Sequence, residues 1–294
     1  MSSVHTATLE IAYLEYGPAD GASVILMHGF PDDVHAYDAV APALAAAGWR
    51  VLVPWLRGYG PTRFLDAGTP RSGQQAALGG DLLSFMDAMG ISQAVLVGYD
   101  WGGRACCIVA ALWPQRARGL VSVNGWNIQE ITTANRPAAP EQELRYWYQW
   151  YLQTERGRAG MVAHRREIGR MLWRLWSPNW AFDDETFGRT AASWDNPDYV
   201  AVVVHSYRHR YGAAPGDAAL EPIERRLAAR PRIAVPTVVL DGAADGVGPP
   251  TVEDRHAAMF TGPYRRVLVP GAGHFLPREA PQAVVDAVQS LPAR

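Results

Sequence analysis

Short apolar runs alternate with stretches of helical spacing in the first and last parts of the chain, and this alternation is missing between them. Apolar runs with the length of buried strands occupy residues 9–16, 24–27, 50–53, 94–97, 120–123, 237–240 and 267–269. Helical spacing marks residues 34–47, 72–89, 104–112, 253–260 and 278–290. Strands that alternate with helices predict an α/β fold with a mostly parallel, doubly wound sheet.

The middle of the chain contains no apolar run typical of a buried strand. It has aromatic-rich and arginine-rich helical stretches, separated by breaks at Ser177-Pro178-Asn179 and Asn196-Pro197-Asp198. We therefore predict an α/β core, residues 1–126 and 217–294, interrupted by a helical cap insertion, residues 127–216. Six of the 11 tryptophans lie in this insertion, at Trp147, Trp150, Trp173, Trp176, Trp180 and Trp194. Such crowding predicts a segment that lines an apolar cavity or packs over one.

Composition excludes several classes of chemistry. All 27 basic residues are arginine, so no lysine is present for an imine, a pyridoxal phosphate site or a Walker-type phosphate loop. The 294 residues are 48% hydrophobic and 19% charged, which is typical of a soluble globular protein. The formal net charge of -2 gives no electrostatic reason to expect nucleic acid. The eight histidines are scattered without a ligand spacing, so we expect no metal and no cofactor.

Cysteine usage and the first residues predict a cytoplasmic protein. Cys106 and Cys107 are adjacent, which does not suit a loop-closing disulfide and indicates a reducing compartment. Residues 1–5 lack the basic start and apolar run of a signal peptide, and no stretch is apolar enough for a membrane span. We expect a small-molecule substrate and water as partners, without a membrane. A homodimer is left open.

The strongest local motif is Gly98-Tyr99-Asp100-Trp101-Gly102-Gly103, which lies between the strand at 94–97 and the helical run at 104–112. Small residues on both sides of the central residue permit the strained strand-to-helix turn that holds a nucleophile above a sheet. Here the central residue is the aspartate Asp100. The alternative interpretation is an ordinary aspartate that caps the following helix.

Several ordered motifs resemble the α/β-hydrolase superfamily, in the branch of the epoxide hydrolases and haloalkane dehalogenases. The resemblance covers nearly the whole chain, and a nucleophile, an acid and a histidine follow in the order typical of the family. The motifs are His28-Gly29-Phe30-Pro31, Arg57-Gly58-Tyr59-Gly60, the turn at Asp100, Gly242-Ala243-Ala244-Asp245 and Gly271-Ala272-Gly273-His274-Phe275.

An aspartate nucleophile suits displacement at saturated carbon, because a carboxylate is ionised at neutral pH and forms an alkyl ester there. The resemblance makes His274 the general base for hydrolysis of that ester and Asp245 the acid that orients it. Asp241 is closer to its strand and is expected to close the turn. Some haloalkane dehalogenases place the acid after the preceding strand. Here residues 124–129 offer no carboxylate, and Glu130 is the fallback.

The resemblance also implies an oxyanion hole and a way to hold the leaving group. The backbone N–H groups of Phe30 and Trp101 are the expected oxyanion donors, with a cis bond before Pro31. Tyr148 and Tyr207 resemble the two cap tyrosines with which epoxide hydrolases hold the epoxide oxygen. The residues before Tyr207 depart from that pattern, and packing of the cap onto the core is the alternative role for both tyrosines. The expected substrate pocket consists of Phe30, Trp101, Tyr148, Gln149, Trp150, Tyr207 and Phe275.

The predicted activity is opening of an apolar epoxide to a vicinal diol through a covalent ester on Asp100. The alternative is a dehalogenase of haloalkanes or haloacetates that uses the same aspartate. Phe30 weighs against haloalkanes, because haloalkane dehalogenases often have asparagine there. Arg104 matches one of the two arginines of fluoroacetate-type dehalogenases, but pairing with a neighbouring carboxylate is an equal alternative for it. A ligand-binding receptor without turnover is the alternative from another class of protein.

The arginine-rich part of the insertion allows two interpretations, and one of them is a binding surface for an anionic partner. Because Glu155 and Glu167 are interleaved with the arginines, a solvated helix face over an aromatic face is favoured.

Overall fold

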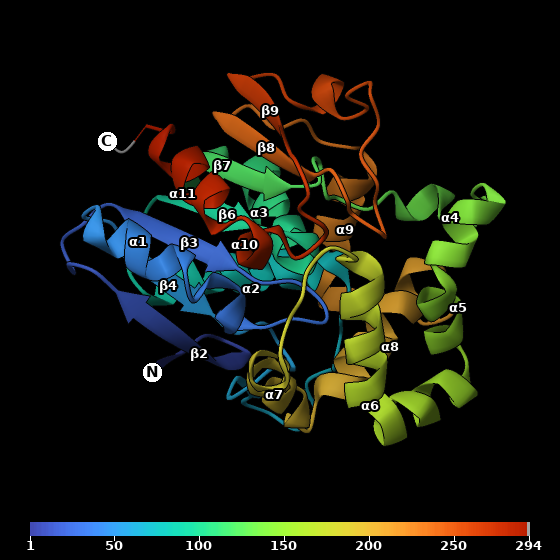
Figure 1. Ribbon diagram of the computed structural model, residues 1–294. Coiled ribbons are helices and arrows are strands. Elements are labelled where there is room, and N and C mark those ends of the chain that lie inside the picture. Colours follow the sequence, from blue (N-terminus) through green and yellow to red (C-terminus); the bar gives the residue numbers. More distant parts are fainter. Residues whose placement is uncertain (293–294) are drawn as a thin grey trace.

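A mostly parallel sheet forms the centre of the fold in the computed structural model, which describes residues 1–292 (Figure 1). The nine strands of the described chain follow the order β1-β2-β4-β3-β6-β7-β8-β9, and β5 pairs with β2. Pairs from β4 to β9 are parallel, whereas β1, β2 and β5 pair antiparallel. The strands are β1 (Ser2–His5), β2 (Leu9–Tyr16), β3 (Ser23–Met27), β4 (Arg50–Pro54), β5 (Arg63–Phe64), β6 (Ala94–Gly98), β7 (Ala117–Val123), β8 (Thr237–Gly242) and β9 (Tyr264–Val269).

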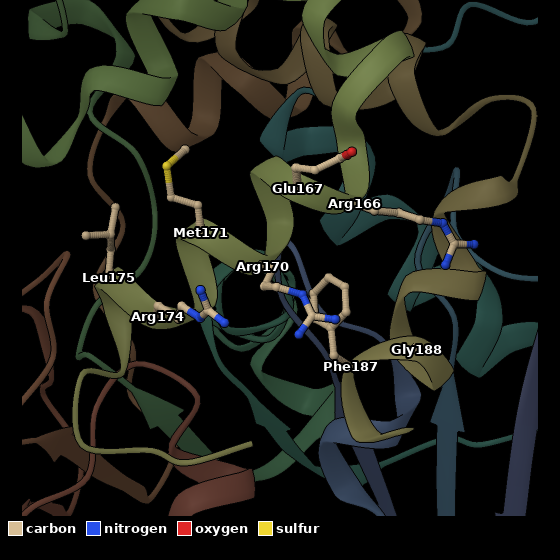
Figure 2. A pocket seen from close by; sticks show the side chains of 8 residues that line it. All are labelled: Arg166, Glu167, Arg170, Met171, Arg174, Leu175, Phe187 and Gly188. Carbon is tan, nitrogen blue, oxygen red and sulfur yellow. The ribbon is translucent and has the colours of Figure 1, made fainter. Parts of the chain in front are cut away.

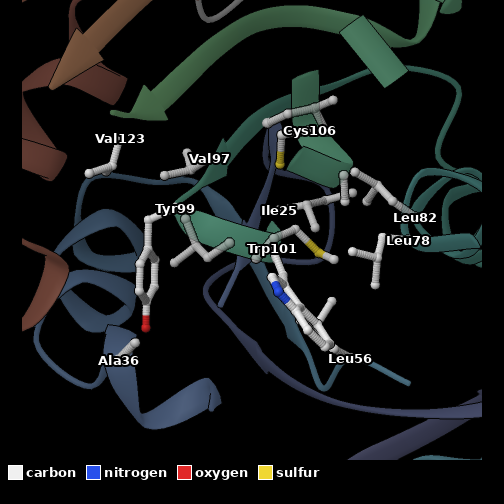
Figure 3. Close-up of a cluster of buried hydrophobic side chains, with 14 of the residues drawn as sticks. Ile25, Ala36, Leu56, Leu78, Leu82, Val97, Tyr99, Trp101, Cys106 and Val123 are labelled. Carbon is white, nitrogen blue, oxygen red and sulfur yellow. The ribbon is translucent and has the colours of Figure 1, made fainter. Parts of the chain in front are cut away.

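Hydrophobic burial explains why these runs form strands. All five residues of β6 are buried, and Val24 and Ile25 of β3 pair in register with Val95 and Leu96 of β6. Runs that are apolar at consecutive positions suit strands covered on both faces. Figure 3 shows Ile25 and Leu78 of α2 near Cys106 of α3 in this buried layer. The predicted strands are confirmed, whereas β1 and β5 were not predicted because β1 is polar and exposed and β5 has two residues.

Helices cover both faces of the sheet (Figure 1). One face carries α1 (Val40–Ala46), α10 (Leu276–Glu279) and α11 (Pro281–Gln289), and the other carries α2 (Gln75–Ala88), α3 (Asp100–Leu112) and α9 (Glu221–Ala228). Packing of α2 on α3 depends on Gly79, because a Cβ there would lie 2.3 Å from Cγ2 of Ile108. The predicted α/β fold with a mostly parallel, doubly wound sheet is confirmed.

The chain between β7 and β8 forms helices and, within the described residues, no strand of the sheet. We call five of them the cap helices: α4 (Pro140–Arg145), α5 (Trp147–Gln153), α6 (Glu155–Trp176), α7 (Asp184–Ala191) and α8 (Tyr199–Arg210). They lie together beside one end of the sheet (Figure 1). No helix within residues 1–292 combines the length and the apolar character that crossing a membrane requires. The boundaries 127 and 216 of the insertion stay a prediction.

Three helix predictions differ from the structure. Residues 34–47 form a 3-10 turn, Val34–Tyr37, followed by α1, and residues 278–290 divide into α10 and α11 at Pro281, which has no N–H to continue the first helix. The predicted helix at 253–260 is wrong, since only Ala257–Met259 form a 3-10 turn. There the side chain of Asp254 accepts a hydrogen bond from the backbone N–H of His256 and competes with a helix.

Candidate active site

Asp100 forms the turn between β6 and α3 and adopts a φ of 49°, in the left-handed region that non-glycine residues seldom occupy. The turn needs glycines, because a Cβ on Gly102 would lie 2.1 Å from the carbonyl oxygen of Met27. Tyr99, not Asp100, is the N-cap residue of α3, so the alternative that Asp100 caps this helix is wrong. The strained turn instead places the Asp100 carboxylate above the end of the sheet.

The backbone of the loop after β3 holds the Asp100 carboxylate. The N–H of Phe30 donates to Oδ1 of Asp100 at 2.8 Å, and the Phe30–Pro31 peptide bond is cis, as the resemblance implies. The N–H of Trp101 lies in the first turn of α3, where helix N–H groups have no partner within the helix. Within the described residues it makes no hydrogen bond to Asp100, so its oxyanion role stays a prediction.

Loops after neighbouring parallel strands bring the other polar residues to the same edge of the sheet, where functional residues of α/β folds gather. Asp245 follows β8 and His274 follows β9. The Asp245 Oδ2 lies 2.8 Å from Nδ1 of His274, and Nε2 of His274 lies 3.8 Å from Oδ2 of Asp100. The second distance is too long for a hydrogen bond, and the buried Nε2 has no hydrogen-bond partner within residues 1–292.

Opposing effects set the pKa values of this pair. Burial works to lower the pKa of His274, but the Asp245 carboxylate, its hydrogen bond and the Asp100 carboxylate outweigh burial and raise the pKa above 6.5. Burial works to raise the pKa of Asp245, but His274 and the N–H groups of Gly248 and Val247 lower it. Asp245 is therefore an ionised carboxylate beside a basic imidazole.

Asn124 is a member of this group that the sequence did not identify. It follows β7 with a φ of 67°, and its Nδ2 donates to Oδ2 of Asp245 at 2.8 Å. Its position directly after a buried strand was the available signal. Asp245 thus lies between two side-chain partners, which holds its carboxylate against His274.

A further set of hydrogen bonds joins the His274 loop to the end of α6. Glu279 accepts from the backbone N–H of Gly273 at 2.8 Å and from the hydroxyl of Ser177 at 2.5 Å. The carbonyl oxygen of Trp176 accepts from the backbone N–H of His274 at 3.1 Å. The position of His274 is therefore coupled to the cap helices.

Aromatic rings cover the Asp100 side of the site. The ring of Phe30 lies 6.2 Å from that of Tyr148 and 5.7 Å from that of Tyr207, and the two tyrosine rings meet edge to face at 5.4 Å. Both tyrosines are buried, which raises the pKa of each hydroxyl and keeps it protonated. The ring of Trp176 lies 5.1 Å from Tyr148 and 5.0 Å from His274, so it joins the same cluster.

The structure does not bring every expected pocket residue into this cluster. Gln149 is buried and donates to the hydroxyl of Tyr148 at 2.9 Å. Trp150, one position further along α5, is 38% exposed and packs on Tyr211 at 4.4 Å. Phe275 is fully buried behind His274, where its ring stacks on Trp176 at 6.1 Å. Helical geometry explains the difference between Gln149 and Trp150, because adjacent residues of a helix point in different directions.

The other candidate acids lie elsewhere. Asp241, the last but one residue of β8, pairs with Arg266 of β9 at 2.6 Å. The fallback acid Glu130 is exposed and lies 3.6 Å from Arg230. Their partners are arginines, so neither carboxylate is placed beside His274 in the way that Asp245 is.

Arg104 is buried on α3, close to Asp100. Its Nε donates to the carbonyl oxygen of Asn127 at 3.3 Å, and within residues 1–292 it forms no ion pair with a carboxylate. The alternative that it pairs with a neighbouring carboxylate is therefore wrong. Burial and the neighbouring Arg210 lower the pKa of Arg104 to about 10, although the Asp100 carboxylate opposes this.

A surface hollow of about 770 Å³ is lined by residues of α6 and α7 (Figure 2). Arg170 pairs there with Asp184 at 2.5 Å and lies over the ring of Phe187. The arginines of α6 face outward while Trp173 and Trp176 are buried, which confirms the solvated helix face over an aromatic one. None of the predicted site residues lines this hollow.

Within the described residues no cluster of His, Cys, Asp and Glu has the arrangement of a metal site.

A nucleophile turn after one parallel strand, with an acid and a histidine after later strands, defines the α/β-hydrolase class of enzymes. The family model of the alpha/beta hydrolase fold matches residues 22–281, and the chain belongs to that family.

Individual relatives are similar over most of the chain. Epoxide hydrolase A of Mycobacterium tuberculosis is 29% identical, over 97% of this chain and 94% of its own. Bifunctional epoxide hydrolase 2 of Sus scrofa is 31% identical over 61% of this chain but only 30% of its own length. The crystal structure of a candidate epoxide hydrolase from Klebsiella pneumoniae is 47% identical, with a TM-score of 0.96 over 98% of this chain and 95% of that one.

Proposed function

We propose that this protein is an epoxide hydrolase that converts an apolar epoxide into a vicinal diol through a covalent ester on Asp100. One observation carries the proposal: the buried rings of Tyr148 and Tyr207 pack on Phe30, the residue whose backbone N–H holds the Asp100 carboxylate. His274 lies 3.8 Å from that carboxylate. The names of the similar proteins support the same activity. The aromatic surroundings suit an apolar substrate.

The first step forms the ester. Oδ1 of Asp100 accepts the Phe30 N–H, so Oδ2 is free to attack an epoxide carbon. The ring C–O bond breaks as the new C–O bond forms, and the epoxide oxygen takes a proton from the hydroxyl of Tyr148 or Tyr207. The tyrosines are the source of that proton because their raised pKa keeps them neutral until the oxygen develops charge.

The second step hydrolyses the ester. His274 takes a proton from water as the water oxygen attacks the carboxyl carbon of Asp100, and the oxyanion forms at Oδ1 beside the Phe30 N–H. The ester C–O bond then breaks, and the departing diol oxygen takes the proton back from His274. The second proton of the water remains on the regenerated carboxyl group of Asp100. It then passes to the tyrosine that lost its proton in the first step, which restores both residues.

Ester formation also prepares His274 for its role. The negative charge of Asp100 is one of the causes that raise the pKa of His274. Because the ester is neutral, its formation removes this cause and lowers the pKa. His274 is thereby converted toward the neutral base at the stage at which a base is needed.

A variant that cannot complete the second step tests this function. We expect His274→Gln to form the ester and retain it, so that intact-protein mass spectrometry after incubation with styrene oxide shows an increase equal to the whole epoxide. Ser3→Ala, far from the site, is the control and should show no increase and normal turnover. Absence of any adduct on His274→Gln, together with absence of diol from the wild type, would contradict the proposal.

A dehalogenase is the second candidate, favoured by one observation. Nε1 of Trp101, next to Asp100, is buried without a hydrogen-bond partner among residues 1–292, and an indole N–H is a suitable donor for a departing halide. Parallel screens of epoxides, haloalkanes and haloacetates separate the two activities. Halide release without diol formation would favour the dehalogenase, and binding without either product would favour a receptor.

A further inference from the structure

The side chain of Gln149 connects Tyr148 to a cation. Its Nε2 donates to the Tyr148 hydroxyl oxygen at 2.9 Å, while its Oε1 accepts from Nη1 of Arg210 at 2.9 Å and from the hydroxyl of Tyr211 at 2.6 Å. Arginine has donors and no acceptor, so the amide oxygen of Gln149 must face Arg210. The amide nitrogen must then face Tyr148.

This orientation determines where the Tyr148 proton points. A hydroxyl oxygen that accepts a hydrogen bond from Gln149 cannot donate its own proton to the same amide nitrogen. Within residues 1–292, Gln149 is the only hydrogen-bond partner of that hydroxyl. The Tyr148 O–H is therefore left to donate to a bound substrate.

Arg210 is half-buried, and its hydrogen-bond partners are neutral side chains. The amide of Gln129 satisfies its neighbours when its oxygen faces the arginines. In that orientation the oxygen accepts from the guanidinium of Arg210 and, at 3.2 Å, from that of Arg104. The guanidinium carbon lies 5.0 Å from the centre of the Tyr207 ring. No ion pair to a carboxylate involves Arg104 or Arg210 in the described part of the chain. Two guanidinium charges thus lie beside the tyrosine pair without a neutralising partner.

We propose that Arg210 is a positioning residue for epoxide opening, which through Gln149 directs the Tyr148 proton into the site and whose charge stabilises the epoxide oxygen as it becomes negative. The inference rests on the proposed function. In the first step negative charge leaves Asp100 and arrives at the oxygen held by Tyr148 and Tyr207, next to Arg210. A fixed cation in a water-poor site stabilises that charge without reorganising. Hydrolysis of the ester takes place at the opposite end, beside His274, and does not use Arg210.

The test separates the two half-reactions. Rapid quenching and intact-protein mass spectrometry measure ester formation with styrene oxide. The decay of the pre-formed adduct measures ester hydrolysis. We expect Arg210→Met to slow ester formation roughly 100-fold, the order of effect produced by misplacing a reacting group. We expect it to change ester hydrolysis by less than about twofold, because the variant removes an interaction made only in the first step.

Companion variants keep the test decisive. Arg208→Met, on the same helix but paired with Glu155 at the surface, is the matched control and should leave both rates unchanged. Arg210→Lys should recover part of the loss, because it keeps the charge and loses the forked donor. Gln149→Glu, which cannot donate to Tyr148 but can still pair with Arg210, should also slow ester formation alone. It decides the matter if Arg210→Met does not fold.

The outcomes distinguish the inference from the function on which it rests. Unchanged ester formation in both Arg210→Met and Gln149→Glu, or equal slowing of both half-reactions, would overturn the role of Arg210 and leave the epoxide hydrolase activity standing. A wild-type protein that forms neither ester nor diol would overturn the proposed function itself, and the role of Arg210 with it.

Discussion

The core side of the candidate site presents carboxylates and an imidazole, whereas the cap side presents two phenols and the guanidinium group of Arg210. On the core side Asp245 has a partner of opposite sign in His274. On the cap side Arg210 is bonded to neutral amide oxygens. Paired charges favour a fixed geometry, whereas an unpaired cation favours a negative charge that appears during a reaction.

Two arginines of core helices show the contrast between a paired and an unpaired cation. Arg278 in α10 pairs with the buried Asp32 at 2.5 Å and donates to Thr190 of α7 at 2.6 Å, and the net effect of Asp32 raises its pKa despite burial. Arg104 is equally enclosed but has no such partner, and its pKa is lowered to about 10. Arg278 therefore joins core to cap as a structural residue, whereas Arg104 belongs to the electrostatics of the site.

The largest expected effect comes from removing both phenols. We expect Tyr148→Phe and Tyr207→Phe each to slow ester formation roughly 100-fold, the effect of losing one hydrogen-bond donor to the developing charge. The double variant should be slower still. Hydrolysis of a pre-formed ester should be unchanged, which rapid quenching with mass spectrometry measures. Tyr146→Phe, also in the cap, is the matched control. If ester hydrolysis slowed as much as ester formation, the assignment of ester formation to the cap side and hydrolysis to the core side would be wrong.

Removal of the core-to-cap arginine should affect stability. We expect Arg278→Met to lower the free energy of unfolding by about 3–5 kcal/mol, because Asp32 is left buried without its cation. Arg189→Met, which breaks an exposed pair with Asp38, should change it by less than about 1 kcal/mol. Urea unfolding at pH 7 measures both. Equal effects of the two variants would show that burial of Asp32 does not set the strength of this contact.

The smallest expected effect is a shift in the titration of His274. In the wild type its imidazole should titrate above pH 6.5, so that the neutral base forms as pH rises through that raised value. Asp245→Asn should lower the pKa of His274, because the variant removes the nearby opposite charge while burial remains. Histidine NMR signals report both values, and Asp286→Asn on α11 is the control. An unchanged pKa would contradict the coupling between Asp245 and His274.

Much of the fold and part of the site could be predicted from local sequence. The buried strands were recognisable because consecutive apolar residues suit a sheet covered on both faces. The turn at Asp100 was recognisable because its glycines remove Cβ atoms that would clash with backbone. The predicted helix at 253–260 failed, since a side chain of Asp254 bonds the backbone in place of a helical turn.

The sequence could not supply contacts between distant segments. Asn124 and Asp245 are separated by 121 positions, and only the adjacency of β7 and β8 brings them within 2.8 Å. Trp150 was expected in the pocket because it lies next to Tyr148 and Gln149 in the sequence. In the helix its side chain points in another direction and packs on Tyr211. Arg210 was one arginine among many until α5 and α8 packed together and joined it to Gln149.

The sequence alone determined which residues are chemically able to act: an aspartate in a glycine-flanked turn, a later acid and histidine, and a chain without lysine. These properties are local, because they depend on side-chain chemistry and on backbone sterics over a few residues. The tertiary structure decided which groups share the site and what charge surrounds them. Distances, burial and hydrogen-bond direction depend on packing between segments far apart in the chain, and no local pattern contains them.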